Sequence, residues 1–328
     1  MTIREVADIA GVSPSAVSRY FNGGPLSEDK RKKIQKAVKE TGFAPSVSAK
    51  IMRTGKSGQI GVIVPHIHSD SFSHIMSGIA DRTRETKYIL ILGCTDGDRD
   101  REIEYIKAME QNKVEGIILM GTVMTPALRS AMEECPLPIV VTGQNFSGVP
   151  CVYHDDFNAM RELTERMLSK GRRNIAYIGV TEEDAAAGRE RRRGVEAAID
   201  SYEGGKVSLT GVTAEFSSES GRLKMQEILK RSKDTDGVIC ASDFIALGAM
   251  SAIREAGKQI PADISIAGIG DSWADVIARP QLTSVHLYYK QCGIEAVETL
   301  IQFIEKKGKN IPVRQIMLGY DIIERESL

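Results

Sequence analysis

Residues 3–23 read IREVADIAGVSPSAVSRYFNG, and the spacing of their apolar side chains predicts two short helices around a sharp turn. Thr2 fits a capping box with the glutamate three residues later, because the hydroxyl and the carboxylate can each pair with a backbone amide of the first turn. Gly11 ends the first helix, where a residue with positive φ is required. Ser13 as N-cap and Pro14 as first helical residue start the second helix.

A third helix follows, with Ser27 as its cap and its end near Glu40. Ile34, Ala37 and Val38 form an apolar stripe on it, and the lysines around them lie on the outer side. Two short helices joined by a four-residue turn and followed by a third helix are typical of a helix-turn-helix unit, whose second helix enters the major groove of DNA. A small helical protein-interaction domain is the alternative.

On the helix-turn-helix interpretation, the second helix turns its N-terminal side chains toward base edges. Arg19 carries a planar fork that suits guanine O6 and N7. Serine hydroxyls, Asn22 and the first amides of the helix would hold phosphates, which positions the unit without reading sequence. The predicted DNA contacts of this segment are Thr2, Ser13, Pro14, Ser15, Ala16, Ser18, Arg19 and Asn22.

Charge is distributed unevenly along the chain. The 328 residues have a formal net charge of -1, from 43 basic and 44 acidic side chains. Residues 1–57 hold eleven basic and five acidic side chains, a balance of +6, so residues 58–328 carry -7. Such asymmetry favours nucleic-acid binding by the basic segment, and a solvated basic face without a partner is the alternative.

Length and composition predict a soluble protein of about two domains. The N-terminus carries charges and no apolar core, so no signal peptide is expected, and no apolar run approaches the 18 residues that span a bilayer. The five cysteines are scattered and form no CxxC pair, which is typical of reduced thiols. We expect a cytoplasmic protein without a membrane partner.

Beyond residue 57, short apolar runs alternate with helical patterns. The runs lie at 60–64, 88–92, 116–120, 139–142, 174–178, 237–241, 264–269 and 315–318. The helical patterns lie at about 73–86, 98–111, 155–169, 188–201, 218–231, 242–256 and 290–306. This alternation predicts parallel sheets covered by helices, and such sheets bind ligands beyond the carboxyl ends of their strands.

No pattern in this part of the chain predicts catalysis. The segment 268–270 reads GIG, but no complete GxGxxG or GxxxxGK[ST] sequence follows a strand. His66, His68 and His74 have no standard metal-ligand spacing and are expected in solvated loops. No Ser-His-Asp set or carboxylate pair stands out, so we expect no enzyme, no cofactor and no metal.

Residues 3–23, together with KRKKIQKAVKETGFAPSVSAKIMRTGKSGQIGVIVP at 30–65, resemble the LacI/GalR family of bacterial transcriptional regulators. The resemblance implies an all-α helix-turn-helix DNA-binding domain at 1–44 and a hinge helix with linker at 45–57. It further implies an α/β periplasmic-binding-protein-like domain at 58–328 for effector binding and dimerisation. This domain would hold two doubly wound parallel-sheet subdomains, the first at about 58–155 plus 288–318 and the second at about 156–287 plus 319–328.

The resemblance also implies a third DNA element at the hinge. In this family the hinge helices of a dimer enter the minor groove, where an apolar side chain opens the central base step. Ser46 is a suitable N-cap, and Met52 stands where the family usually has leucine. Ala49, Lys50 and Met52 are the predicted contacts. The alternative is that 45–57 is only a linker.

The family pattern places an effector between the two subdomains. Arg191 has the Arg-x-x-Gly spacing of the family's sugar-binding arginine, although it also suits a solvated helix start. Asp243 follows a strand as a ligand acceptor or as a helix N-cap. Gly270 replaces the first acid of the family's usual pair, which leaves Asp271. Trp273 would stack on a sugar face or pack in the protein.

The remaining predicted effector residues complete the site on the other subdomain and on its floor. Tyr289 takes the family's aromatic position, and the first strand is followed by the predicted wall of His66, Ser69, Asp70 and Phe72. The segments 151–156 and 172–180 are similar to the branch of trehalose and sucrose operon repressors. A disaccharide or its 6-phosphate is therefore the expected effector, with the arginines at 189–193 available for a phosphate.

The sequence therefore predicts a homodimeric regulator, most simply a repressor of a sugar-utilisation operon. It would bind pseudo-palindromic double-stranded operator DNA and be released from it or retained on it by a small-molecule sugar. One alternative is a catabolite-type regulator that needs a corepressor or protein partner. A plain sugar-binding protein and a sugar-processing enzyme are alternatives of other classes.

Overall fold

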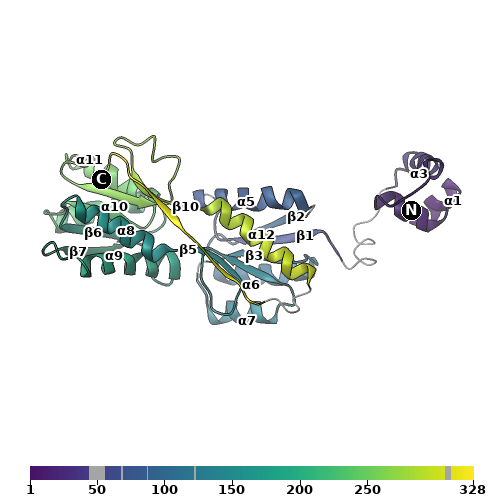
Figure 1. The fold of residues 1–328 in the computed structure, drawn as a ribbon, viewed down its shortest axis with the longest axis horizontal. Coiled ribbons are helices and arrows are strands. Elements are labelled where there is room, and N and C mark those ends of the chain that lie inside the picture. The colour runs from purple at the N-terminus through teal and green to yellow at the C-terminus, as the bar shows by residue number, and fades with distance from the viewer. Residues whose placement is uncertain (44–55, 68, 87, 122, 307–311) are drawn as a thin grey trace. The chain divides into compact units, whose positions relative to one another are not determined.

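The computed structural model describes residues 1–43, 56–67, 69–86, 88–121, 123–306 and 312–328, in two compact units, Met1–Gly58 and Gln59–Leu328 (Figure 1). The first, called here the helical unit, consists of α1 (Ile3–Ala10), α2 (Pro14–Phe21) and α3 (Glu28–Thr41). Val6, Val17 and Ile34 are fully buried where the three helices meet. The predicted three-helix order is confirmed.

Capping in the helical unit follows the sequence closely. The Thr2 hydroxyl accepts from the Glu5 amide at 3.3 Å, and the Thr2 amide donates to Glu5 Oε2 at 2.7 Å. Gly11 ends α1 with φ 61°, and Ser13 Oγ accepts from the Ala16 amide at 3.3 Å. Ser27 precedes α3, but the prediction that its side chain caps the helix is wrong, because it makes no capping hydrogen bond.

The second unit, called the α/β unit, holds two six-stranded sheets. The first sheet is parallel throughout and defines the N-subdomain. Its strand order is β11-β5-β4-β3-β1-β2, with β1 (Gln59–Val64), β2 (Ile89–Cys94), β3 (Ile117–Met120), β4 (Ile139–Thr142), β5 (Cys151–His154) and β11 (Gln315–Leu318).

Helices cover both faces of this sheet. They are α5 (Asp70–Thr86) and α12 (Tyr289–Glu305) on one face, and α6 (Arg99–Gln111) and α7 (Pro126–Glu134) on the other. Glycines let α5 and α12 approach closely. A Cβ at Gly78 would lie 2.0 Å from the Lys290 carbonyl oxygen, and one at Gly293 would lie 2.1 Å from that of Ile75.

The second sheet defines the C-subdomain. Its order is β12-β10-β9-β8-β6-β7, with β6 (Asn174–Gly179), β7 (Ser208–Thr213), β8 (Gly237–Cys240), β9 (Ser265–Ile269), β10 (Thr283–Leu287) and β12 (Tyr320–Ile323). Its helices are α8 (Asp156–Ser169), a π-helical turn η1 (Ala185–Glu190), α9 (Arg191–Asp200), α10 (Ser218–Arg231) and α11 (Asp243–Glu255). Only β12 runs antiparallel to its neighbour, β10.

The chain passes between the subdomains three times: between β5 and α8, between β10 and α12, and at Gly319 between β11 and β12. Each predicted apolar run forms a strand. The strands β5, β7, β10 and β12 and the helix α7 were not predicted. The edge strands β7 and β12 are only partly buried, so their sequences lack the continuous apolar run of a central parallel strand.

The five cysteines form no disulfide. Among the residues that the structure describes, no helix is both long enough and apolar enough to cross a membrane.

Candidate functional site

The exposed face of α2 carries most of the predicted base-facing side chains. Pro14, Ser15 and Arg19 are exposed at the surface of the helical unit. Ser18 is half-buried, and its carbonyl oxygen accepts a 2.6 Å hydrogen bond from Asn22 Nδ2. This bond draws the Asn22 amide group over the last turn of α2.

Ala16 is a correction to the predicted set. Its side chain is 2% exposed and packs with Val17 in the core of the helical unit. Neighbouring residues of α2 point about 100° apart, so the buried side of the helix must be wide enough to include both Ala16 and Val17. Ala16 therefore spaces α2 from the other helices instead of pointing outward.

Thr2 and Ser13 lie at the two helix starts, with hydroxyls already engaged in the capping bonds described above. The lysines and arginine at 30–33 are exposed on α3, opposite its buried stripe. Ala49, Lys50 and Met52 lie outside the described residues. The described part of the helical unit thus presents α2 and a basic side of α3 to solvent.

A buried ion pair lies at the carboxyl ends of the C-subdomain strands. Arg191 Nε donates to Asp156 Oδ1 at 2.7 Å, and Arg191 Nη1 donates to the Ala241 carbonyl oxygen at 2.6 Å. Arg191 is 7% exposed and Asp156 is 4% exposed. The alternative of a solvated helix start therefore does not apply to Arg191.

The neighbouring arginines differ from Arg191. Arg192 pairs with Glu182 at 2.7 Å and with Glu196 at 2.8 Å, and Arg193 pairs with Glu190 at 2.8 Å, all at the surface. The sequence alone left the register of these arginines open. Burial distinguishes them, because Arg191 is the buried one of these three arginines.

Aromatic and imidazole side chains surround the ion pair. The rings of His154 and Tyr289 meet edge to face with centroids 5.2 Å apart. Burial lowers the pKa of His154, so its ring is neutral at pH 7. Burial raises the pKa of Tyr289 to about 12 and also raises that of Tyr177, so both phenols keep their protons. Tyr289 packs against the cores of both subdomains.

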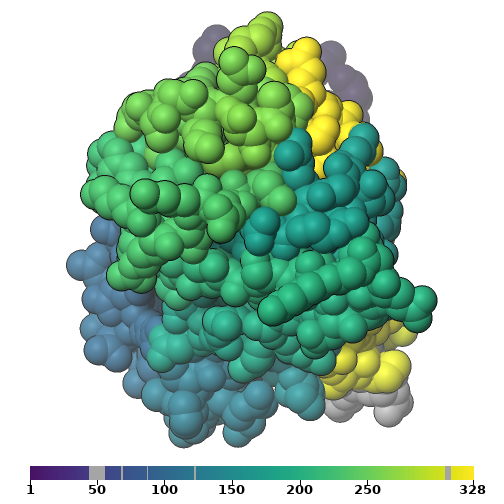
Figure 2. Space-filling view, turned by 90° about the vertical axis from the view of Figure 1, so that its left-hand side faces the viewer, coloured from purple at the N-terminus to yellow at the C-terminus, as the bar shows by residue number. Residues whose placement is uncertain are grey.

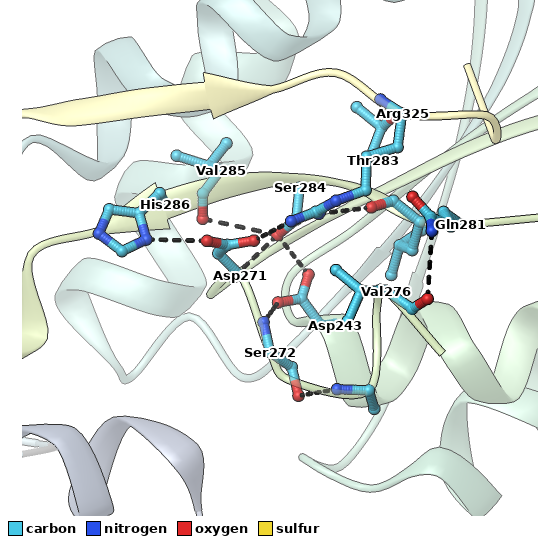
Figure 3. A network of polar contacts seen from close by, with 12 residues as sticks. Asp243, Asp271, Ser272, Val276, Gln281, Thr283, Ser284, Val285, His286 and Arg325 are labelled. Atoms are coloured by element: carbon cyan, nitrogen blue, oxygen red, sulfur yellow. Dashed lines mark hydrogen bonds and ion pairs between the residues drawn. The ribbon is translucent and has the colours of Figure 1, made fainter. Parts of the chain in front are cut away.

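Asp243 is bound internally (Figure 3). Its Oδ1 accepts from Ser284 Oγ at 2.6 Å, and its Oδ2 accepts from the Ser272 amide at 3.1 Å. The N-cap alternative for Asp243 is wrong, because Ser242 caps α11 and Asp243 is the first helical residue. A Cβ at Gly270, whose φ is 139°, would lie 2.8 Å from Asp243 Oδ2. A side chain at position 270 would therefore collide with the buried carboxylate of Asp243.

Asp271 is also held within the C-subdomain. It pairs with Arg325 Nη2 at 2.5 Å and with His286 Nδ1 at 2.9 Å (Figure 3). Arg325 belongs to the C-terminal segment, which Figure 2 shows in yellow against the light green part of the C-subdomain. Both carboxylate oxygens of Asp271 are occupied, so this residue anchors the C-terminus.

Trp273 and His66 are both exposed. Trp273 is 66% exposed, so its predicted packing role is wrong, while stacking on a sugar face stays a prediction. His66 Nδ1 lies 3.5 Å from Asp96 Oδ1, and its place in the predicted wall also stays a prediction.

The other three residues of the predicted wall have different roles: Ser69 is a capping residue, Phe72 packs in the core, and Asp70 contacts the C-subdomain. Ser69 Oγ accepts from the Phe72 amide at 3.2 Å, and Phe72 packs on the N-subdomain core. Asp70 Oδ2 accepts from Ser272 Oγ at 2.5 Å, a hydrogen bond between the two subdomains. Asp70 thereby connects to the network around Asp243.

Gln144, just after β4, makes a second link between the subdomains. Its Nε2 donates to Asp184 Oδ1 at 2.7 Å, and its Oε1 accepts from the Ala186 amide at 3.0 Å. An ion pair of Arg99 with Glu183 lies beside it. Both links reach the start of η1, at Glu183, its N-cap Asp184 and Ala186, and π-helical turns are frequent at functional sites.

Sequence reasoning missed Asp156, His154, Tyr177, Gln144 and Asp275. His154 ends β5 and Asp156 begins α8, and because β5 was not predicted, their position at a strand end was not recognised. Gln144 lies two residues after β4 and Asp275 six residues after β9, and no sequence pattern marked either of them. Among the described residues, no group of three His, Cys, Asp or Glu side chains is placed to hold a metal ion.

Comparison with known proteins agrees with this architecture. Residues 2–46 match the family "Bacterial regulatory proteins, lacI family", and residues 164–328 match "Periplasmic binding protein-like domain". The chain is 31% identical to the HTH-type transcriptional regulator RegA of Clostridium saccharobutylicum, over 99% of this chain and 98% of that protein. It is 27% identical to the sucrose operon repressor of Staphylococcus xylosus, over 92% and 93%.

Solved structures show the same fold. A transcriptional regulator CelR–cellobiose complex superposes with a TM-score of 0.73 at 26% identity, covering 100% of this chain and 99% of that one. The lac repressor dimer bound to operator and the anti-inducer ONPF superposes with a TM-score of 0.88 at 21% identity, covering 100% and 98%.

A helix-turn-helix unit followed by a two-subdomain α/β unit defines a DNA-binding transcriptional regulator. The chain belongs to the lacI family of bacterial regulatory proteins.

Proposed function

We propose that the protein is a homodimeric repressor of a sugar-utilisation operon in the cytoplasm, without catalytic activity, and that a sugar bound between its subdomains controls its affinity for operator DNA. The supporting observation is the buried Arg191–Asp156 pair, at the strand ends where ligands of open parallel sheets bind. The functional domains would be 1–44 for DNA, 45–57 as hinge and 58–328 for effector and dimer.

Control requires two states of the α/β unit with different affinities for the sugar. The hydrogen bonds Asp70–Ser272 and Gln144–Asp184 join the subdomains beside the proposed site. A sugar seated at Arg191 would change which of these bonds form and so alter the orientation of the subdomains. Ala49, Lys50 and Met52 in the hinge would pass this change to the minor groove.

Relatives of different types bear on two points: whether the sugar weakens or strengthens operator binding, and which kind of sugar binds. The sucrose operon repressor supports the predicted trehalose and sucrose branch. Catabolite control protein A of Priestia megaterium is 26% identical over 96% of this chain, which supports the catabolite-type regulator as the second candidate. We take release by a disaccharide as the first candidate.

Fluorescence anisotropy tests the proposal. A pseudo-palindromic operator is selected from random DNA and titrated with the full-length protein, with and without sucrose, cellobiose and ribose. Weaker operator binding with sugar supports release, and tighter binding supports the corepressor candidate. The same affinity across a wide panel of sugars would show that the effector proposal is wrong.

Arg19→Ala tests the DNA-reading role of α2. Because one bidentate contact to guanine discriminates by about 1–3 kcal/mol, specific operator affinity should fall about 5- to 150-fold. Binding to unrelated DNA should change little, and Arg84→Ala on the α/β unit is the matched control. Equal losses of affinity for operator and unrelated DNA would show that Arg19 contacts phosphate and does not read a base.

A further inference from the structure

The N-subdomain contains a cavity of about 300 Å³, called here the α7 pocket. Its walls are α7, the amino end of β4, the turn before β5 and the end of α12. The amino ends of parallel strands meet at one edge of a sheet, and their carboxyl ends meet at the opposite edge. The α7 pocket is therefore separate from the proposed sugar site, which lies at carboxyl ends of strands.

The floor of the α7 pocket is apolar. Met132 and Ile139 are 9% and 7% exposed, and Leu137, Val149 and Phe303 are partly buried around the same cavity. Ligand pockets of about 300–1,000 Å³ are lined mainly by apolar side chains, with a few polar groups that fix the orientation of the ligand. The α7 pocket lies at the lower end of this range, so it suits a small ligand with one apolar group.

Two charged side chains of α7, Arg129 and Glu133, also line the α7 pocket. Arg129 Nη1 donates to the Ser147 carbonyl oxygen at 3.2 Å, which holds the guanidinium beside the turn before β5. Neither charged side chain forms an ion pair with any residue that the structure describes. Both charges are therefore available to a ligand.

The absence of an Arg129–Glu133 ion pair is unusual within this part of the chain. Arginine and glutamate four residues apart on a helix are close enough to pair. Four other pairs at this spacing have ion-pair distances of 2.7–2.9 Å: Arg161–Glu165, Glu162–Arg166, Arg192–Glu196 and Glu227–Arg231. The α7 pocket thus carries two opposite charges, about one helical turn apart, that do not compensate each other directly.

The end of α7 favours a positive group from a ligand. Its last turn holds Glu133 and Glu134 and has no basic side chain. The carbonyl groups at a helix C-terminus carry a partial negative charge, so acidic side chains there are unfavourable and a cation nearby is stabilising. A ligand ammonium beside Glu133 would supply this missing positive charge.

We infer that the α7 pocket binds a free α-amino acid with a bulky apolar side chain. The ligand carboxylate pairs with Arg129, the ligand ammonium pairs with Glu133, and the apolar side chain occupies the floor. A simple carboxylate would meet the charge of Glu133, and a simple amine would meet that of Arg129, so the zwitterion matches both. This site gives the regulator a second small-molecule ligand besides a sugar.

Isothermal titration calorimetry of the full-length protein with L-leucine, L-methionine and L-phenylalanine tests the ligand class. At least one of them should bind at one site per chain. Its amide lacks the carboxylate, and its deaminated acid lacks the ammonium, so each analogue should bind about tenfold more weakly or less. Failure of all three amino acids to bind, or equal affinity for either analogue, would overturn the inference.

Arg129→Met and Glu133→Gln test the position of the site with the amino acid that binds. Each should weaken binding about tenfold or more, because one ligand charge loses its partner. Arg129→Lys should restore part of the affinity lost in Arg129→Met, because it keeps the positive charge. Amino-acid affinity that is unchanged in both Arg129→Met and Glu133→Gln would place the ligand elsewhere and overturn the inference.

Glu134→Gln is the matched control for Glu133→Gln, since this neighbouring glutamate is exposed and does not line the α7 pocket. Arg101→Met on α6 is the control for Arg129→Met, because Arg101 is exposed and lies 3.8 Å from Asp98. Both controls should keep the wild-type affinity for the amino acid. A loss in a control equal to that in its partner variant would show a general charge effect and overturn the assigned contact.

Discussion

Two groups of buried acids in the C-subdomain are built in opposite ways. Asp156 is paired with Arg191, so the charge of each compensates the other. Asp243 and Asp275 lie together, are 2% and 0% exposed, and form no ion pair with a cation among the residues that the structure describes. Burial raises the pKa of both carboxyls, and the charge of Asp243 raises that of Asp275 further, so we expect Asp275 to keep a proton that it can donate to Asp243.

One fold thus buries acids in two ways. The Arg191 guanidinium compensates the charge of Asp156 and keeps further donors for a ligand. Ionisation of both Asp243 and Asp275 would put two like charges side by side, so the stability of this proton-sharing pair depends on pH.

Arg191→Met should have the largest effect. It leaves Asp156 as an uncompensated buried charge, so the free energy of unfolding should fall by about 3–5 kcal/mol, and sugar binding should be lost. Urea unfolding and calorimetry measure the two effects. Arg192→Met is the control, because surface ion pairs contribute only about 0–1 kcal/mol. Equal losses in the two variants would contradict the distinction between them.

Asp275→Asn should stabilise the protein, increasingly as pH rises. Burial and the charge of Asp243 hold the pKa of Asp275 far above its ordinary value of 3.8, so the folded state binds a proton that the unfolded state releases. The free energy of unfolding of the wild type should therefore fall as pH rises above about 4, by up to about 1.4 kcal/mol per pH unit.

Urea unfolding of the wild type and Asp275→Asn between pH 5 and 8.5 measures this slope. Asn at 275 has no proton to lose, so the slope should flatten in the variant. Asp234→Asn, at an exposed position, should keep the wild-type slope. A wild-type slope retained in Asp275→Asn would refute the shared proton.

The smallest effect is expected where the proton-sharing group meets the N-subdomain. Ser272→Ala removes the hydroxyl that donates to Asp70 but keeps the amide that donates to Asp243, so it should cost about 0.5–1.5 kcal/mol. A double-mutant cycle with Asp70→Ala should show a coupling of similar size. Strictly additive effects would mean that this bond does not join the subdomains in solution.

The helical unit could be predicted almost completely, because its signals are local. Caps at Thr2 and Ser13, the turn at Gly11 and the stripe at Ile34 lie within one or two helical turns of what they control. Ala16 was misplaced because the small side chain of alanine suits either the core or a groove of DNA. Only packing against α1 and α3 decides its direction.

The candidate effector site was predicted in part. Arg191 and Tyr289 were predicted from the resemblance to the family, while His66 and Trp273, predicted in the same way, are exposed. Asp243 was found, although the donors that occupy it come from residues 272 and 284. The position of a residue after a strand indicates that it lies near the ligand edge of a sheet, but not where its side chain points.

The class of this protein follows from signals along the chain: a basic helix-turn-helix segment with local capping residues, joined to alternating strands and helices. Which buried acids have a compensating cation follows from the tertiary fold. Capping and periodicity act between near neighbours in the chain, whereas the pairs Arg191–Asp156 and Asp243–Asp275 depend on strands that are distant in sequence and adjacent in space.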